Sequence, residues 1–186
     1  MVFRRRRAAP DPLAGVDPSL APPRFAPAVA DALATRQRYR SLVDGLAEGP
    51  LRERLTTLGE QLDAGVLAVW TTVQRAAEVE RVVATLDPDQ ATAAYKRAKR
   101  DGADPDVLAA HEARFAAVQR LLNTLDDTGG RLELLDARLD GIVARAAEVS
   151  LTAGAGVDEL DAELAGVVSE LGALRAALDD LGAAPT

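Results

Sequence analysis

A heptad pattern of small and apolar residues between Leu51 and Leu86 constrains the fold of this chain more than any other feature. Its inward positions, here called a seam, recur in alternating steps of four and three: Leu51, Leu55, Leu58, Leu62, Gly65, Val69, Thr72, Ala76, Val79, Val83 and Leu86. A period that averages 3.5 residues keeps one seam on one side of a slightly supercoiled helix. The sequence therefore predicts a helix over residues 51–86 that lies along a partner helix for about 54 Å.

Three further seams follow along the chain. They comprise Leu108, His111, Phe115, Val118, Leu122 and Leu125; then Leu132, Leu135, Leu139, Ile142, Ala146 and Val149; then Leu160, Leu164, Val167, Leu171, Leu174, Leu178 and Leu181. The register slips between the first two of these, at Gly129-Gly130. Two glycines inside a helix cost about 1 kcal/mol each relative to Ala, which tertiary packing can offset. We therefore favour one long bent helix over two separate ones.

Proline positions support the helix boundaries. Gly49-Pro50, Asp87-Pro88 and Asp104-Pro105 each place a capping residue before a Pro at the first helical position, where the missing N–H is not needed. Before Gly49-Pro50, a weaker amphipathic pattern indicates a first helix at about 27–48. The sequence thus predicts four main helices and one short helix, with the short helix at 88–100 and the main helices at about 27–48, 51–86, 106–151 and 157–182.

The expected fold class is all-α, an elongated antiparallel helical hairpin or coiled-coil-like bundle over residues 27–182. The helices at 51–86 and 106–151 form the hairpin, the first helix returns along the former, and the last helix returns along the latter. Aromatic residues make up only 3% of the chain, which favours helices over strands. Pairing within one chain has the lower entropic cost, and the alternative is a final helix that closes the bundle of a second copy.

The N-terminal segment, residues 1–26, differs from the rest. Six of the ten prolines fall between Pro10 and Pro27, and few apolar residues separate them. Such a segment buries too little surface to offset its ordering entropy, so we expect it to be disordered or loosely extended. It lacks the apolar stretch of a signal peptide, and no stretch of the chain is apolar enough to span a membrane. A cytoplasmic location is therefore expected.

Composition argues against several kinds of chemistry. The chain has no Cys and one His, so it cannot build disulfides, thiolate zinc sites or multi-histidine metal sites. Phosphate-binding glycine motifs and the Gly-x-Ser-x-Gly motif are missing from the sequence. His111 could act as a general base, but its seam position four residues before Phe115 favours a packed histidine. The acidic residues at 158–163 complement the dipole of the last helix. We expect no cofactor, no metal and no catalytic site.

The most unusual local feature is a group of basic residues beside an aromatic one at the expected turn of the hairpin: Tyr95, Lys96, Arg97, Lys99 and Arg100. Positive charge at the end of the short helix complements its dipole, which is a sufficient structural explanation. The functional hypothesis is a docking patch for phosphate-bearing lipid, nucleic acid or an acidic protein surface. Four charges are too few for strong DNA binding, and the net charge of −7 opposes it.

A second basic group follows Met1-Val2-Phe3 and consists of Arg4, Arg5, Arg6 and Arg7. Anionic lipid attracts such residues by about 1 kcal/mol each near the surface, enough for reversible contact. The alternative interpretation is an unstructured terminus that aids solubility.

In outline, the long helices over residues 51–151 and the leading Met1 to Arg7 resemble the phage-shock-protein A and ESCRT-III group of membrane-remodelling proteins. The short Pro-rich start departs from the N-terminal amphipathic helix of that group. The resemblance implies a peripheral protein at the inner face of the membrane that binds anionic lipid through its N-terminus and hairpin tip. We favour instead a non-enzymatic adaptor or scaffold that engages a protein partner, or a second copy, through coiled-coil and charged surfaces.

Overall fold

The molecule is built from α-helices, with no strand in the described ranges, 11–152 and 156–182, of this computed structural model. A 3-10 helix at Pro18–Leu20 comes first. The α-helices are α1 (Ala26–Asp44), α2 (Pro50–Leu86), α3 (Pro88–Arg100), α4 (Pro105–Leu151) and α5 (Val157–Gly182). The prediction of an all-α fold is confirmed, and α2 to α5 begin and end within one residue of the expected positions.

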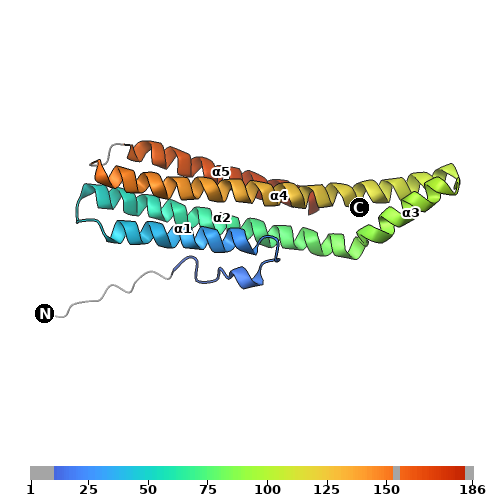
Figure 1. Ribbon diagram of the computed structural model, residues 1–186, viewed down its shortest axis with the longest axis horizontal. Coiled ribbons are helices and arrows are strands. Elements are labelled where there is room, and N and C mark those ends of the chain that lie inside the picture. The colour runs from blue at the N-terminus through green and yellow to red at the C-terminus, as the bar shows by residue number, and fades with distance from the viewer. Residues whose placement is uncertain (1–10, 153–155, 183–186) are drawn as a thin grey trace.

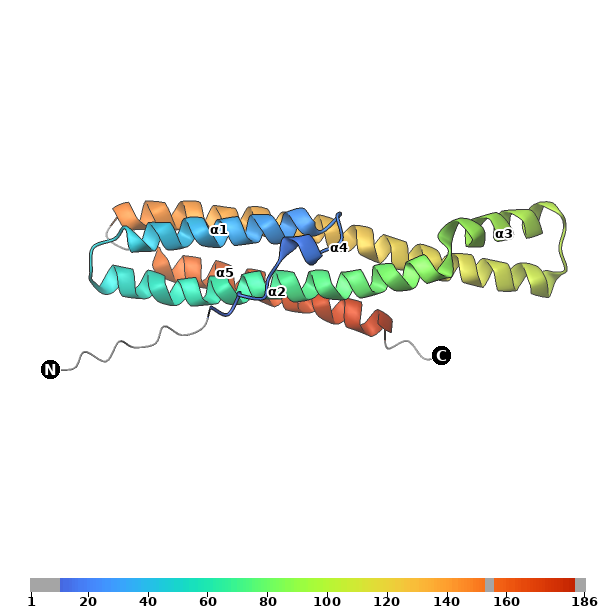
Figure 2. The ribbon, with the colours of Figure 1, turned by 90° about the horizontal axis from the view of Figure 1, so that it is seen from below.

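The helices form an elongated molecule with two unequal parts (Figure 1). In the four-helix part, α1 and α5 each pack against both α2 and α4, which run in opposite directions along the long axis (Figures 1 and 2). Beyond it, α3 packs against the start of α4, and we call residues 88–118 the arm. The arm places the end of α3 beside the start of α4 and far from α1, α2 and α5 (Figure 2).

The final helix differs from expectation in its main neighbour. We expected it to return along α4, but its most extensive contacts are with α2. Gly65 lies at this contact, where a Cβ atom would stand 3.6 Å from Cγ2 of Val168 on α5, an ordinary van der Waals distance. The α5 helix also contacts α4.

Burial follows the seams. The third seam, on α4, is buried throughout, and the last is buried up to Leu178. On α2 the seam is buried from Leu55 to Val83. Each fully buried Leu or Val contributes about 1.5–3 kcal/mol. The second seam is different: Val118 and Leu125 are buried, whereas His111 is only half-buried, because α3 alone covers α4 in the arm.

Residues 11–25, called the leader below, are ordered despite their proline-rich sequence. Leu13 and Phe25 are 4% and 1% exposed and belong to the main core, although residues up to 26 were expected to be disordered or loosely extended. Asp17 caps the 3-10 helix, since its side chain accepts a hydrogen bond from the Ser19 N–H. Apolar anchors at the two ends of the segment, together with prolines that restrict the unfolded chain, offset the ordering entropy. Residues 1–10 lie outside the described ranges.

Two glycine sites determine how α4 begins and continues. The helix is unbroken through Gly129-Gly130, as favoured from the sequence, and a Cβ atom at Gly130 would meet nothing within 4 Å. The α3–α4 turn instead requires its glycine, because Gly102 has φ +65°. There the Ala103 N–H donates to the Ala98 carbonyl at 3.0 Å, in the pattern of a Schellman motif. None of the described helices combines the length and apolar character needed to cross a bilayer.

The two glycines predict opposite effects of one substitution. Gly130→Ala should raise the free energy of unfolding by about 0.5–1 kcal/mol, because Ala is the better helix former and no contact opposes it. Gly102→Ala should lower it by about 1 kcal/mol, because Ala is strained at positive φ. Urea denaturation measures both. Destabilisation by Gly130→Ala would contradict a continuous helix at this position.

Candidate functional site

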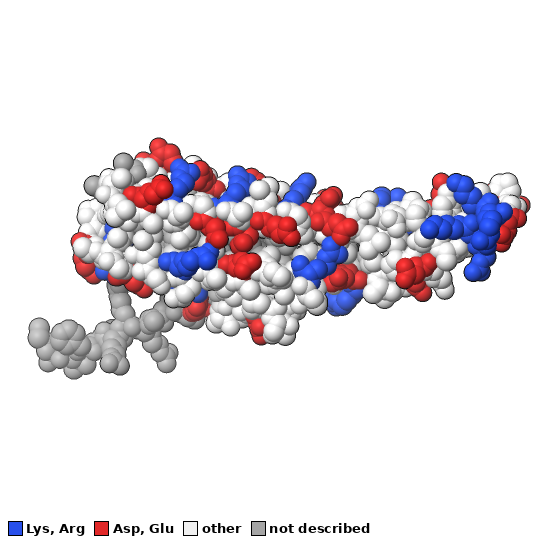
Figure 3. Space-filling model, viewed as in Figure 1, with Lys and Arg blue, Asp and Glu red and all other residues white. Residues whose placement is uncertain are grey.

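The end of the arm carries the group of basic residues that the sequence singled out. Lys96, Arg97, Lys99 and Arg100, called the basic cluster below, are all exposed on the last two turns of α3. Figure 3 shows the Lys and Arg side chains gathered at this extremity of the molecule. The structure thus brings together the five predicted residues 95–97, 99 and 100, whereas the predicted group Arg4–Arg7 falls outside the described ranges.

Packing against α4 orients the basic cluster outward. Ala91 and Ala98 are buried, and the Tyr95 ring stacks on Phe115 with centroids 5.1 Å apart and planes 12° from parallel. The Lys99 ammonium lies 5.9 Å from the centre of the Tyr95 ring, within the range of a cation–π contact. The apolar face of α3 is therefore used internally, and its cationic face remains for other contacts.

The charges of the basic cluster are poorly compensated. Arg100 pairs with Asp101 at 3.1 Å, but within the described ranges Lys96, Arg97 and Lys99 have no carboxylate oxygen within 4.0 Å. Asp89 is the single acidic residue of α3, which gives this helix a net charge of +3.

In the four-helix part, by contrast, many arginines form ion pairs within the molecule. Arginines there reach across to acidic residues of neighbouring helices, with pairs such as Arg138–Glu170 at 2.6 Å and Arg75–Asp179 at 2.9 Å. Arg54–Asp158 and Arg145–Glu163 are further examples. These exposed pairs each contribute at most about 1 kcal/mol, but they balance the charge of α5 against its neighbours.

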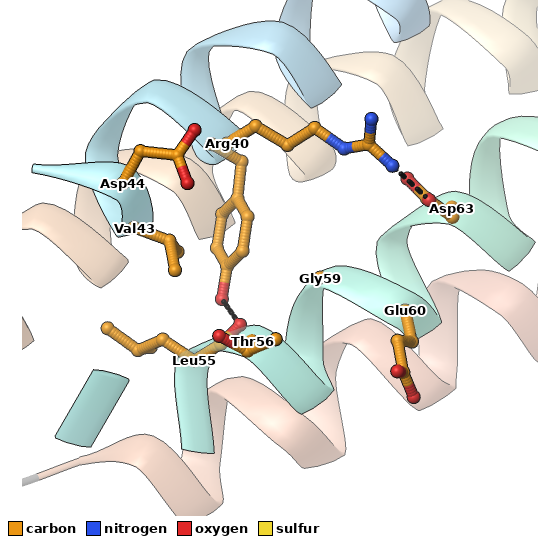
Figure 4. Close-up of a pocket in the computed structure, with 9 residues that line it drawn as sticks. Arg40, Val43, Asp44, Leu55, Thr56, Gly59, Glu60 and Asp63 are labelled. Carbon is orange, nitrogen blue, oxygen red and sulfur yellow. Dashed lines mark hydrogen bonds and ion pairs between the residues drawn. The ribbon is translucent and has the colours of Figure 1, made fainter. Parts of the chain in front are cut away.

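A cleft of about 320 Å³ between α1 and α2 was not foreseen from the sequence (Figure 4). The Tyr39 ring enters it over Gly59, where a Cβ atom would lie only 3.3 Å from Cε1 of the ring. Its hydroxyl donates to the Leu55 carbonyl at 2.8 Å, and burial raises the pKa of Tyr39 above its usual value. The phenol is therefore neutral and its proton is engaged, so Tyr39 is not an activated base or nucleophile.

Beside the cleft, a charged network ties the leader to two helices. Arg36 is only 10% exposed, and its Nε donates to Asp63 at 2.6 Å while one terminal nitrogen donates to Asp11 at 2.6 Å. Arg40 also donates to Asp63, at 2.8 Å. The hydrogen bond from Arg36 lowers the pKa of Asp11, and the bond to Asp63 raises the pKa of Arg36. The guanidinium thus joins α1, α2 and the leader.

Asp136 is the least satisfied carboxylate of the α1–α4 contact. One of its oxygens is buried without a hydrogen-bond partner. Burial, together with the nearby carboxylates Asp140 and Asp31, raises its pKa to about 6 against the opposing effect of Arg38. Arg38 and Thr35 both bind Asp140 instead. In the described part of the chain, no group of three or more acidic or histidine side chains is placed to hold a metal ion.

The network predicts a large effect at Arg36. Arg36→Met should lower the free energy of unfolding by about 2 kcal/mol, because it leaves Asp63 with only the exposed Arg40. Asp11→Asn removes only the outer pair, whose carboxylate is 45% exposed, and should cost less than about 1 kcal/mol. Chemical denaturation of both variants tests this order, and equal losses would contradict it.

Asp136 predicts a pH-dependent effect. Its folded pKa lies above the unfolded value of 3.8, so protonation stabilises the folded chain below pH 3.8 and this gain is lost as the pH rises through about 6. Asp136→Asn should therefore be more stable than the parent at pH 8 by about 1 kcal/mol, after allowance for solvent screening, and equal to it near pH 4. Asp127→Asn, at an exposed position of the same helix, should change little at either pH. Thermal melts at both values measure the difference, and a pH-independent effect of Asp136→Asn would refute the assignment.

Comparison with known protein families finds no matching family model, and comparisons with curated proteins and with solved structures find no significant match. The function is therefore argued from the surfaces of this chain alone.

Proposed function

We propose that this protein is a non-enzymatic adaptor or scaffold, a helical rod that engages another macromolecule through its exposed helical and charged surfaces. The observation that carries the proposal is the exposed and poorly compensated basic cluster at the end of the arm, the part of the molecule farthest from the four-helix part. A helix that needed positive charge only to complement its own dipole would not require an arm to hold it away from the bundle.

The proposal includes a role for the long helices. We infer that α2 and α4 act as a coiled-coil-like antiparallel hairpin that fixes the distance between the arm and the four-helix part. Their seams supply the packing that such a hairpin needs. A protein partner, or a second copy of the chain, would bind along exposed helix faces. The cytoplasm is the location that we expect for this interaction.

The different roles of charged residues in the four-helix part and in the arm support this proposal over an enzymatic one. In the four-helix part, cross-helix ion pairs engage many of the arginines within the molecule, which serves stability and solubility. In the arm, the cations face outward on a helix whose apolar face is already packed. Charged groups displayed in this way contribute specificity and association rate in macromolecular binding.

Site-specific cross-linking tests the proposal. A photo-cross-linking amino acid in place of Ala93, exposed on α3 next to the basic cluster, should yield one or a few discrete adducts in cells. The same residue in place of Ala137, exposed on α4 in the four-helix part, should yield at least about tenfold less of those adducts. Light scattering of the purified chain shows whether a second copy accounts for them. Adducts of equal yield at both positions, or no adduct at either, would refute the proposal.

A further inference from the structure

We propose that the basic cluster docks the molecule end-on onto an anionic lipid bilayer. Lys96, Arg97, Lys99 and Arg100 contact the phosphate and other acidic groups of the lipid headgroups, and the four-helix part stands away from the surface. This inference rests on the proposed function and names the partner of the arm.

The shape of the arm favours a flat partner. The basic cluster occupies the narrow, projecting end of the molecule (Figure 3). Four clefts of the described residues are lined by α1, α2, α4, α5 and the leader, outside residues 88–118. A projecting helix face that carries cations suits an extended anionic surface whose headgroups move laterally to meet it.

Charge along the molecule favours the end-on orientation. The chain carries a net charge of −7, and α5 has seven acidic residues against Arg175. An anionic surface therefore repels the four-helix part and attracts the basic face of α3, an attraction that the exposed Asp101, Asp104 and Asp106 at the α3–α4 turn reduce but do not cancel. The 13 residues of α3 span about 20 Å, roughly two Debye lengths at physiological ionic strength. At that distance the repulsion is largely screened, while the attraction at the end of the arm is not.

The contact is electrostatic and does not insert α3 into the bilayer. Tyr95 is stacked on Phe115, and Ala91 and Ala98 are buried against α4, so the apolar face of α3 is not available to lipid. Four cations near an anionic membrane give a partition coefficient of about 10³ M⁻¹, which sedimentation with excess lipid detects. Binding of this kind is reversible and is lost at high salt.

Vesicle co-sedimentation with the full chain tests the proposal. The parent should bind phosphatidylglycerol–phosphatidylcholine vesicles at low salt and should bind neither pure phosphatidylcholine vesicles nor mixed vesicles at high salt. The double variant Lys96→Glu and Arg97→Glu should bind mixed vesicles at least about 30-fold more weakly. The matched control, Arg81→Glu and Arg131→Glu, changes the net charge equally at exposed positions outside the arm and should remain within about threefold of the parent.

The other basic group requires its own variant. Substitution of Arg4, Arg5, Arg6 and Arg7 by Gln should leave most vesicle binding intact. Complete loss of binding in that variant, or parental binding in the Lys96→Glu and Arg97→Glu variant, would overturn the proposal. Equal thermal melts of the parent and the variants in α2, α3 and α4 show that those substitutions, which lie at exposed positions, leave the fold intact.

The orientation is testable because the chain has no Cys. An environment-sensitive dye on Asp101→Cys, in the turn at the end of the arm, should change its emission when mixed vesicles are added. The same dye on Ser169→Cys, at an exposed position of α5, should not. A response at Ser169→Cys equal to that at Asp101→Cys would refute the end-on orientation.

The outcomes separate this inference from the proposed function. Discrete protein adducts at Ala93 without vesicle binding would refute lipid docking and leave the adaptor proposal standing. Stronger binding of the parent to double-stranded nucleic acid than to vesicles, lost in the Lys96→Glu and Arg97→Glu variant, would likewise reassign the basic cluster to a different partner. Vesicle binding that depends on the basic cluster, without protein adducts, would support lipid docking and refute the adaptor proposal.

Discussion

Burial of the leucine and valine seams along α2 and α4 is the interaction on which the rest of the structure depends. These two helices supply the shared surface against which α1 and α5 pack, and α4 continues beyond them to carry α3. The seams are deeply buried where four helices meet and only half-buried where α3 alone covers α4. Stability is therefore concentrated in the four-helix part, and the arm is held by fewer apolar contacts and one aromatic stack.

Features set by local sequence could be predicted well. Helix boundaries at Pro50, Pro88 and Pro105 follow from the backbone chemistry of proline and its preceding cap, and the continuity of α4 follows from packing that outweighs two glycine penalties. The exposed basic face of α3 could also be anticipated, because Ala91, Tyr95 and Ala98 recur at helical spacing and so share the opposite face. The main partner of α5 could not, since the apolar seam of α5 fits either long helix and α5 contacts both.

Pairings between distant residues were beyond sequence analysis for a different reason. Arg36 meets Asp11 and Asp63 only after α1, α2 and the leader have been placed, and in a chain with 29 acidic residues the sequence offers many equivalent partners. The cleft at Tyr39 is similar. Gly59 within a predicted helix was the one available signal, because a glycine in a helix interior commonly marks a close approach. The order of the leader was hidden because two apolar anchors outweigh a proline-rich composition.

The unbroken course of α4 has a mechanical consequence. This helix runs for 47 residues, about 70 Å, from the α3–α4 turn to the opposite end of the molecule, whereas α2 stops at Asp87, where the backbone turns into the left-handed region before α3 begins. A force applied at the α3–α4 turn is therefore transmitted by one covalent strut and not by two. At the base of the arm α4 is continuous, and the other connection is the single residue Asp87 between α2 and α3.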